Sequence, residues 1–224
     1  MLTSFVGGAM MSGQGAEFVG RRVLVAGSAG DLDVALTEAL GALLANVIVE
    51  RVATADAKGP SARSTERYDE VFALTQGAVR SLGGLDAVIT MVELDRAALA
   101  MAIARDKVES YCTETLAGPL AAIRVALNRM ETTWVEGALV AVLVIPAGLP
   151  AGASLVAQIA RSMLADMVRH EAIRAAPFGI SVRAVIVDQS VTDDAAAAVS
   201  AILSAISLSA ANLTGVAVEV DGCC

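Results

Sequence analysis

The sequence predicts a single α/β domain with a doubly wound, Rossmann-like parallel sheet. Short apolar segments rich in β-branched residues alternate with longer segments of helical periodicity, and glycines mark many of the junctions. The short segments have no polar face, which is typical of parallel strands covered by helices on both sides. The 224 residues are enough for one such domain with a large core.

The elements follow one another without an internal repeat, a low-complexity linker or a domain boundary. Residues 1–20 are apolar and glycine-rich without a basic start, so we expect an N-terminal extension before a domain at 21–224. In order, we expect a strand at Arg22–Gly27, a helix at Asp33–Leu44, a strand at Asn46–Val52, a loop at Ala53–Arg67, a helix at Tyr68–Leu82, a strand at Leu85–Met91, helices at Leu94–Arg105 and Lys107–Met130, a strand at Gly137–Ile145, a helix at Ala153–Ala176, a strand at Ile180–Val187, a helix at Asp194–Ser207 and a strand at Ala217–Val220.

Local signals support the individual elements. The segments RVLVAG and NVIVERV are β-branched, and Gly83-Gly84 is a suitable end for the helix before it. The loop assignment rests on polar residues around Gly59-Pro60. Apolar residues follow one side of the first long helix at helical spacing. They are Val108, Cys112, Leu116, Leu120, Ile123, Leu127 and Met130.

Composition narrows the range of functions. The chain is 56% hydrophobic but only 3% aromatic, so its core must be aliphatic. The net charge is −8 and the largest basic cluster is Arg21-Arg22, which argues against nucleic acid and anionic membranes as partners. Two charge-free stretches, Gly137–Ala160 and Ala195–Val218, are long enough to span a bilayer, but their prolines, glycines and polar residues favour soluble elements.

The few cysteines and the single histidine give no sign of a metal site. Cys112 lies in an apolar helical pattern and is expected in the core. Cys223 and Cys224 are adjacent and suit no disulfide framework, and no C-x-x-C pair is present, so we expect no bound metal. His170 lies between charged residues and is expected in solvent. These features favour a reducing, cytoplasmic location.

Four segments in order resemble the short-chain dehydrogenase/reductase family over about residues 20 to 222. RRVLVAGSAGDLDVAL resembles its first strand, glycine turn and helix, and GGLDAVITMVEL the strand that normally ends in Asn-Asn-Ala-Gly. RHEAIRAAPFGISVRAVIV resembles the end of the central helix with its following strand, and ANLTGVAVEVDG the closing segment. The resemblance implies the family's fold and, in an intact member, binding of a nicotinamide dinucleotide.

The cofactor turn departs from the family pattern T-G-x-x-x-G-x-G. Its four defined positions are here Ala26, Gly27, Asp31 and Asp33. Glycines let the backbone approach the pyrophosphate, and the helix start then binds it. The two aspartates instead suit a capped helix without a ligand. We therefore expect no cofactor on this chain.

The residues at the family's catalytic positions also differ from the family pattern. The Asn-Asn-Ala-Gly positions are Thr90, Met91, Val92 and Glu93, and the remaining family positions are Thr115 for asparagine, Val144 or Ile145 for serine, Ala157 for tyrosine and Arg161 for lysine. The family's chemistry uses the tyrosine as general acid and base beside the lysine. No lysine follows a tyrosine by four residues anywhere, so we expect no catalysis by the chain alone.

Two segments are shorter than in the family. Val187-Asp188 replaces a Pro-Gly pair, and a helix is expected so soon afterwards that no substrate lid fits there. The stretch between Val52 and Tyr68 is also short, which predicts a reduced third-strand region.

The resemblance implies a partner as well. In the family, the two long helices pack against their copies, here Lys107–Met130 and Ala153–Ala176. The second carries the apolar residues Val156, Ile159, Ala160, Met163, Leu164 and Met167, which either cover the chain's own sheet or also contact a neighbour.

Three functional hypotheses remain open. The chain is a non-catalytic subunit that stabilises or completes an active, NAD-binding relative, in a heterotetramer for example. The dehydrogenase acting on 2-(hydroxybenzyl)succinyl-CoA, which pairs an active with a degenerate chain, is a precedent. Alternatively it is a self-associating scaffold or binding module, or an enzyme of different chemistry that uses Thr90, Glu93, Arg161 and Asp188.

Overall fold

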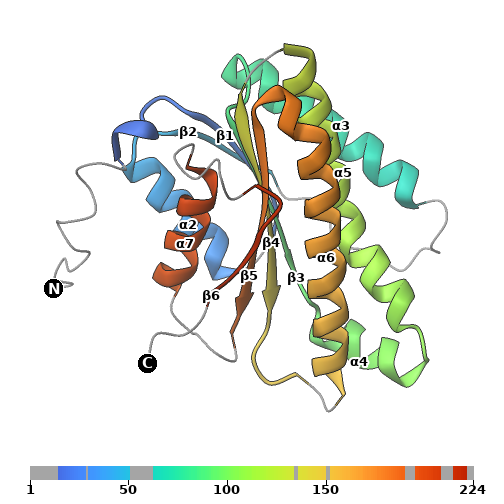
Figure 1. Cartoon of the computed structure of the whole chain (residues 1–224). Coiled ribbons are helices and arrows are strands. Elements are labelled where there is room, and N and C mark those ends of the chain that lie inside the picture. Colours follow the sequence, from blue (N-terminus) through green and yellow to red (C-terminus); the bar gives the residue numbers. More distant parts are fainter. Residues whose placement is uncertain are drawn as a thin grey trace, which may run out of the picture.

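The computed structural model describes residues 15–28, 30–50, 63–133, 136–149, 152–189, 195–207 and 214–220. They form a six-stranded, all-parallel sheet in the order β2-β1-β3-β4-β5-β6, which confirms the predicted doubly wound architecture (Figure 1). The strands are β1 (Arg22–Ser28), β2 (Asn46–Glu50), β3 (Ala87–Glu93), β4 (Gly137–Ile145), β5 (Ile180–Asp188) and β6 (Ala217–Val220). The helices are η1 (Gly15–Glu17), α2 (Asp31–Ala42), α3 (Arg63–Leu82), α4 (Arg96–Ala104), α5 (Val108–Thr133), α6 (Ala153–Ala175), η2 (Ala176–Phe178) and α7 (Ala195–Ile206).

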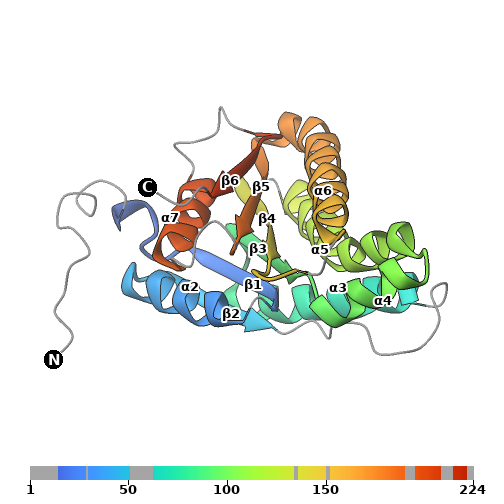
Figure 2. The ribbon, with the colours of Figure 1, turned by 90° about the horizontal axis from the view of Figure 1, so that it is seen from below.

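Helices cover both faces of the sheet. Helices α3, α4, α5 and α6 lie on one face, and α2 and α7 lie on the other (Figure 2). All nine residues of β4 are buried, and they alternate between the two layers: Leu139 packs toward α5 and α6, and Val140 toward α2 and α7. Cys112 is fully buried in the first layer, as predicted. None of the described helices is both long and apolar enough to cross a membrane.

The strand order reverses between β1 and β3. The chain leaves β1 outward to β2 and returns on the other side of β1 as β3. In doubly wound sheets ligands bind in the crevice at such a point. Among the described strands β2 is the outermost on its side, and most of the stretch between Val52 and Tyr68 lies outside the described residues, so its predicted reduction stays a prediction.

The structure corrects several element boundaries. Strand β3 is Ala87–Glu93 rather than Leu85–Met91, and α4 begins at Arg96 rather than Leu94. Helix α3 begins at Arg63, so the predicted loop Ala53–Arg67 is wrong over residues 63–67, and its remainder lies outside the described residues. The segment RSTER has no apolar residue, so hydrophobic periodicity could not reveal this first turn. Helix α2 begins at Asp31 rather than Asp33, one position after Gly30.

The segment just before β1 packs on the domain. Phe18 is 2% exposed and belongs to the core layer under α2 and α7. The Arg21 guanidinium lies 5.4 Å from the centre of the Phe18 ring, within the range of a cation–π contact, and its Nη1 donates to the Ile206 carbonyl at 2.9 Å. The predicted domain start at residue 21 stays a prediction, and residues 1–14 lie outside the described part.

A second arginine also binds the end of α7. Arg183, in the middle of β5, is 1% exposed, and its Nη1 donates to the carbonyls of Ala205 and Ser207. Burial lowers the pKa of this guanidinium. The last carbonyls of a helix have no partner within the helix and carry a partial negative charge. Arg183 and Arg21 together satisfy this end and attach α7 to β5 and to the segment before β1.

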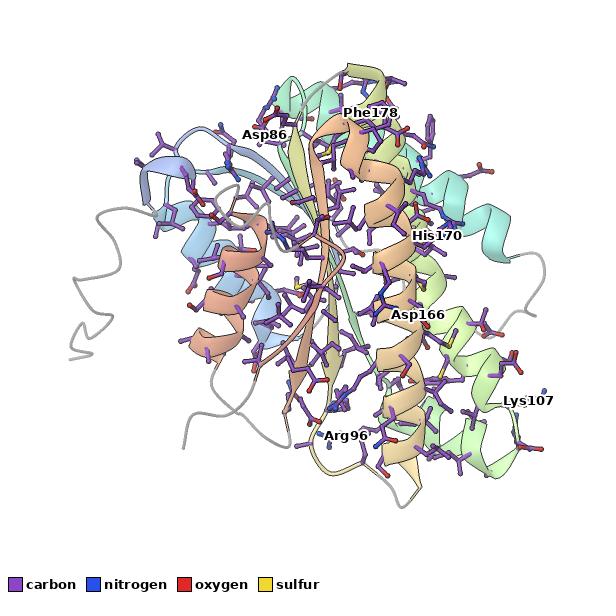
Figure 3. All side chains as sticks on the ribbon, in the orientation of Figure 1. Asp86, Arg96, Lys107, Asp166, His170 and Phe178 are labelled. Carbon is purple, nitrogen blue, oxygen red and sulfur yellow. The ribbon has the colours of Figure 1, made fainter. Side chains whose placement is uncertain are left out.

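An ion pair joins β1 to the residue before β3. The Arg22 side chain donates to both carboxylate oxygens of Asp86, at 2.9 and 2.5 Å, and the Arg22 backbone N–H donates to the same carboxylate at 2.9 Å. Burial of the Asp86 carboxyl raises its pKa, but the bonds and charge of Arg22 lower it by more, so the net pKa lies below the usual value. Figure 3 places Asp86 at the opposite end of β3 from Arg96.

We expect Asp86→Asn to lower the free energy of unfolding at pH 7 by about 2 kcal/mol, because it weakens charge-assisted hydrogen bonds. A carboxyl whose pKa is depressed by folding stabilises the protein fully above its unfolded pKa of about 3.9, and this contribution disappears as the pH falls through the folded-state value. Urea unfolding of both proteins at pH 7 and at pH 3 therefore measures a difference that shrinks in acid. Asp166→Asn is the control, because its pair with Arg169 is exposed and should contribute little. A difference that grows in acid would contradict the assignment.

Candidate functional site at the carboxyl edge of the sheet

The turn between β1 and α2 brings two strands unusually close. Gly27 has a φ of 110°, and a Cβ placed there would lie 2.0 Å from the carbonyl oxygen of Met91 in β3. Any side chain would therefore push β1 away from β3. Gly30, with a φ of 60°, is the N-cap of α2, so this turn keeps glycine at two positions that need it.

Carboxylates gather around the start of α2. Asp31 and Asp33 lie in its first turn, Asp31 exposed and Asp33 buried. The expectation that an aspartate would cap the helix needs correction, because the N-cap residue is Gly30, which has no side chain. Both carboxylates instead lie where the helix dipole favours negative charge. Glu93, at the end of β3, also points here: a Cβ on Gly30 would lie 3.7 Å from its Oε2.

The pKa of Glu93 is affected by the carboxylates that gather in this turn. Burial raises the pKa of Glu93 first, Arg96 lowers it, and the nearby charges of Asp33 and Asp95 raise it again. The net pKa lies above the usual value, so protonating Glu93 relieves repulsion in this turn. Within the described ranges, no three side chains of the His, Cys, Asp or Glu type gather as a metal site would require.

A cavity of about 320 Å³ opens beyond the carboxyl ends of β4 and β5, against the first turns of α6. Its walls are Ile145, Pro146, Gly148, Leu149, Gly152, Ser154, Ala157, Gln158, Arg161 and Asp188. Ile145 faces the cavity, whereas Val144 belongs to the opposite core layer under α2 and α7. The structure therefore decides between the two residues that the sequence left open: Ile145 is the one on the cavity side.

Ala157 and Arg161 lie one turn apart on α6, and both face this cavity. Arg161 Nη2 donates to Asp188 at the end of β5, and its Nη1 lies 3.9 Å from Glu219 Oε1 on β6. The Nε atom of Arg161 is buried without a hydrogen-bond partner. The guanidinium thus links α6 to the last two strands.

The other candidate residues do not assemble into one site. Thr90 is 3% exposed within β3, and Glu93 lies with the carboxylates at the start of α2 and not in the cavity wall. Arg161 and Asp188 come together, as one of the sequence hypotheses required. His170 is exposed on α6, as expected, and Figure 3 shows it there.

Tyr111 is a partly buried residue of α5 to which the sequence patterns assigned no role. Its hydroxyl donates to the Asp95 carbonyl at 3.3 Å. Burial raises the pKa of Tyr111 to about 12, even though its hydrogen bond with Thr115 lowers it. At neutral pH the phenol stays protonated. The four-residue spacing of Tyr111 and Thr115 on a helix was the signal that could have paired them.

We expect Gly27→Ala to destabilise the protein by about 3 kcal/mol or more, because the methyl group would collide with the backbone of β3 and the φ is unfavourable. Gly41→Ala is the matched control: it lies in α2 with open space around the added Cβ and should be neutral or stabilising. Thermal unfolding of both variants measures the contrast. Equal melting temperatures would show that β1 and β3 do not approach so closely.

Comparisons with known proteins concern the fold. No protein-family model matches the sequence, and no curated protein does either. Solved structures do match. The citronellol catabolism dehydrogenase of Pseudomonas aeruginosa PAO1 is 19% identical with a TM-score of 0.68, and the match covers 92% of this chain and 95% of that chain.

Two further matches are similar in kind. A short-chain dehydrogenase from Leptospira borgpetersenii, solved with bound NAD⁺, is 15% identical with a TM-score of 0.68, over 99% of this chain and 96% of its own. A short-chain dehydrogenase from Mycobacterium avium is 20% identical with a TM-score of 0.68, and the match covers 92% of this chain and 84% of that chain. The chain therefore has the Rossmann-like fold of the short-chain dehydrogenases.

Proposed function

We propose that the chain is a non-catalytic subunit of a hetero-oligomeric short-chain dehydrogenase/reductase, which stabilises or completes an active NAD-dependent partner. The observation that carries the proposal is the pair Ala157 and Arg161 on α6, beside a cavity whose described wall residues include no phenol. The resembled chemistry needs a tyrosine and a lysine at these two positions. Arginine stays charged at all ordinary pH values and cannot exchange protons.

Neighbouring residues do not replace the missing group. The bond to Asp188 fixes the Arg161 guanidinium within an ion pair. The Tyr111 phenol, with a pKa of about 12, donates to a backbone carbonyl and is not poised to give up its proton near neutral pH. A general acid or base works best with a pKa near the working pH. These observations support a chain that does not transfer protons by itself.

The residues at the start of α2 do not fit a dinucleotide. A pyrophosphate docked there would face Asp31 and Asp33, with Glu93 close to Gly30. One carboxylate about 4 Å from a phosphate charge costs roughly 4 kcal/mol at an effective dielectric of 20, which is nearly three decades of affinity. The proposal therefore assigns NAD to the partner subunit and none to this chain.

The partner surface is proposed on the outer sides of α5 and α6. The six apolar residues of α6 noted from the sequence all pack on the chain's own core, so they alone do not argue for a partner. Leu155 and Ile173, in contrast, are 62% and 72% exposed. They lie about five turns apart, which places them on one side of the helix. Apolar residues exposed on one helix side are typical of a contact surface.

The activity of the partner is proposed to be of the hydroxyacyl-CoA dehydrogenase type, with 2-(hydroxybenzyl)succinyl-CoA as the model substrate. The support is a similarity to the degenerate chain of that dehydrogenase: in both, the fold is kept while the cofactor and catalytic positions depart from the family pattern. A self-associating scaffold without such a partner is the alternative. Native mass determination after affinity purification separates the two, because the proposal requires an intact relative in the complex.

We expect the isolated chain to show no saturable binding of NADH or NADPH in a fluorescence titration up to millimolar concentration, because of the repulsion at α2. An intact short-chain dehydrogenase run in parallel is the positive control. In the purified complex, bound cofactor should equal the number of active subunits. One bound cofactor for every subunit, this chain included, would refute the assignment of NAD to the partner alone.

We further expect Leu155→Asp combined with Ile173→Asp to abolish co-purification of the partner and to reduce its turnover at least tenfold. The charges would have to be buried on assembly, while the monomer's core is untouched. Val34→Asp, at a residue that is 56% exposed on α2, is the control on the other face and should leave assembly unchanged. If the double variant still assembles with the partner, the interface does not include this side of α6.

A further inference from the structure

Near its middle, helix α5 contains the two poorest helix-forming residue types side by side. Gly118 is followed by Pro119, yet the helix runs without interruption from Val108 to Thr133. Proline has no N–H, so the hydrogen bond from this position to the Thr115 carbonyl is missing, and the proline ring crowds that carbonyl. Glycine adds backbone freedom at the neighbouring position. The helix is therefore easiest to bend at this point.

The two halves of α5 are buried to different extents. Before Gly118, the buried residues of the helix are Cys112 and Leu116. After it, seven residues are buried: Pro119, Ala122, Ile123, Val125, Ala126, Leu127 and Met130. An ion pair from Arg124 to Glu171, at 2.7 Å, also attaches the second half to α6. The second half is thus fixed to the domain more firmly than the first.

The first half of α5 is joined to α4. The Tyr111 hydroxyl donates to the carbonyl of Asp95, the N-cap residue of α4, at 3.3 Å. At the other end of α4, the Lys107 N–H donates to the Ala102 carbonyl at 2.8 Å. Both ends of α4 are therefore hydrogen-bonded to residues at the start of α5. Residues 95–117 form one continuous unit.

This unit lies at the carboxyl edge of the sheet, where Figure 1 shows α4 near the end of β3. Arg96, the first residue of α4, is close enough to Glu93 for its charge to lower the pKa of that carboxyl. The unit contributes Leu99, Cys112 and Leu116 to the core layer that α5 and α6 cover. An outward movement of the unit would separate Arg96 from Glu93 and uncover part of this layer.

We propose that residues 95–117 are a flap, which opens by bending α5 at Gly118-Pro119 and the backbone just after Leu94. The Leu94 N–H donates to the Val144 carbonyl at 3.0 Å, so the chain stays attached to the sheet up to this residue. Opening exposes the crevice at the carboxyl end of β3 while the rest of the domain stays folded. This device depends neither on a partner subunit nor on a dinucleotide.

Cys112 provides a native reporter of the flap. Its thiol is fully buried and lies 4.0 Å from the Val156 carbonyl at the start of α6. Burial raises the pKa of the Cys112 thiol, so little reactive thiolate forms while the flap is closed. A thiol reagent can therefore reach Cys112 when the first half of α5 leaves α6 or when the whole protein unfolds. The two routes differ in their dependence on urea, because global unfolding exposes far more surface.

The experiment uses the full chain with Cys223→Ser and Cys224→Ser, which leaves Cys112 as its one thiol. The rate at which Cys112 reacts with 5,5′-dithiobis(2-nitrobenzoate) is measured from zero to moderate urea concentration. In native buffer the reaction should be at least tenfold faster than the globally unfolded fraction allows, and it should depend little on urea. Gly118→Ala combined with Pro119→Ala should slow it at least tenfold, because the two changes restore the missing hydrogen bond and the helix propensity.

Gly118→Ala alone decides the matter if the double variant fails to fold, since its added Cβ would meet no atom within 4 Å. It should slow the reaction at least threefold. Gly77→Ala is the matched control, because Gly77 lies in α3 with the same open space and is remote in sequence from the bend, so the rate should not change. Circular dichroism and melting temperature establish that the variants are folded.

Two results overturn the flap. In the first, Cys112 reacts only at the rate and with the urea dependence of global unfolding. In the second, Gly118→Ala slows the reaction no more than Gly77→Ala does. Either result leaves the proposed function standing, because that proposal is tested by the partner and the cofactor in the purified complex. A reactive Cys112 in a chain without a dehydrogenase partner would support the flap and refute the proposed function.

Discussion

The burial of β4 on both faces is the constraint on which the rest of the structure depends. Nine consecutive buried residues need a helical layer on each side, because apolar strand surface is unstable in water. The α5–α6 pair covers one face, and α7 covers the other beside α2. This arrangement leaves the carboxyl ends of the strands open, and the turn at Gly27 and the cavity beside α6 both lie there.

Charged side chains gather at this open edge. Arg161 links α6 to Asp188 and approaches Glu219, so the cation contributes to holding three elements together. Ala157, one turn before it, contributes only a methyl group to the wall of the cavity. Carboxylates occupy the region of the first helix turn that an anionic ligand would use.

Buried arginines have a comparable structural role on the opposite layer. Arg183 lies in a mainly aliphatic strand, and together with Arg21 it binds the carbonyls at the end of α7. Losing either cation would leave buried carbonyls without partners, which costs more than the bonds themselves contribute. The position of α7 therefore depends on polar contacts as well as on its apolar face.

The sequence by itself determined the order of strands and helices, the aliphatic core and the departure of the cofactor and catalytic positions from the family pattern, because periodicity and residue type are local properties. It missed the start of α3, where RSTER has no apolar residue to show periodicity. Only the tertiary structure decided that Ile145 rather than Val144 faces the cavity, that Arg161 meets Asp188, that Glu93 joins the carboxylates at α2, and that Phe18 is buried. These facts depend on which segments, far apart in the chain, are brought together by the covering of β4, and no local pattern encodes such distances.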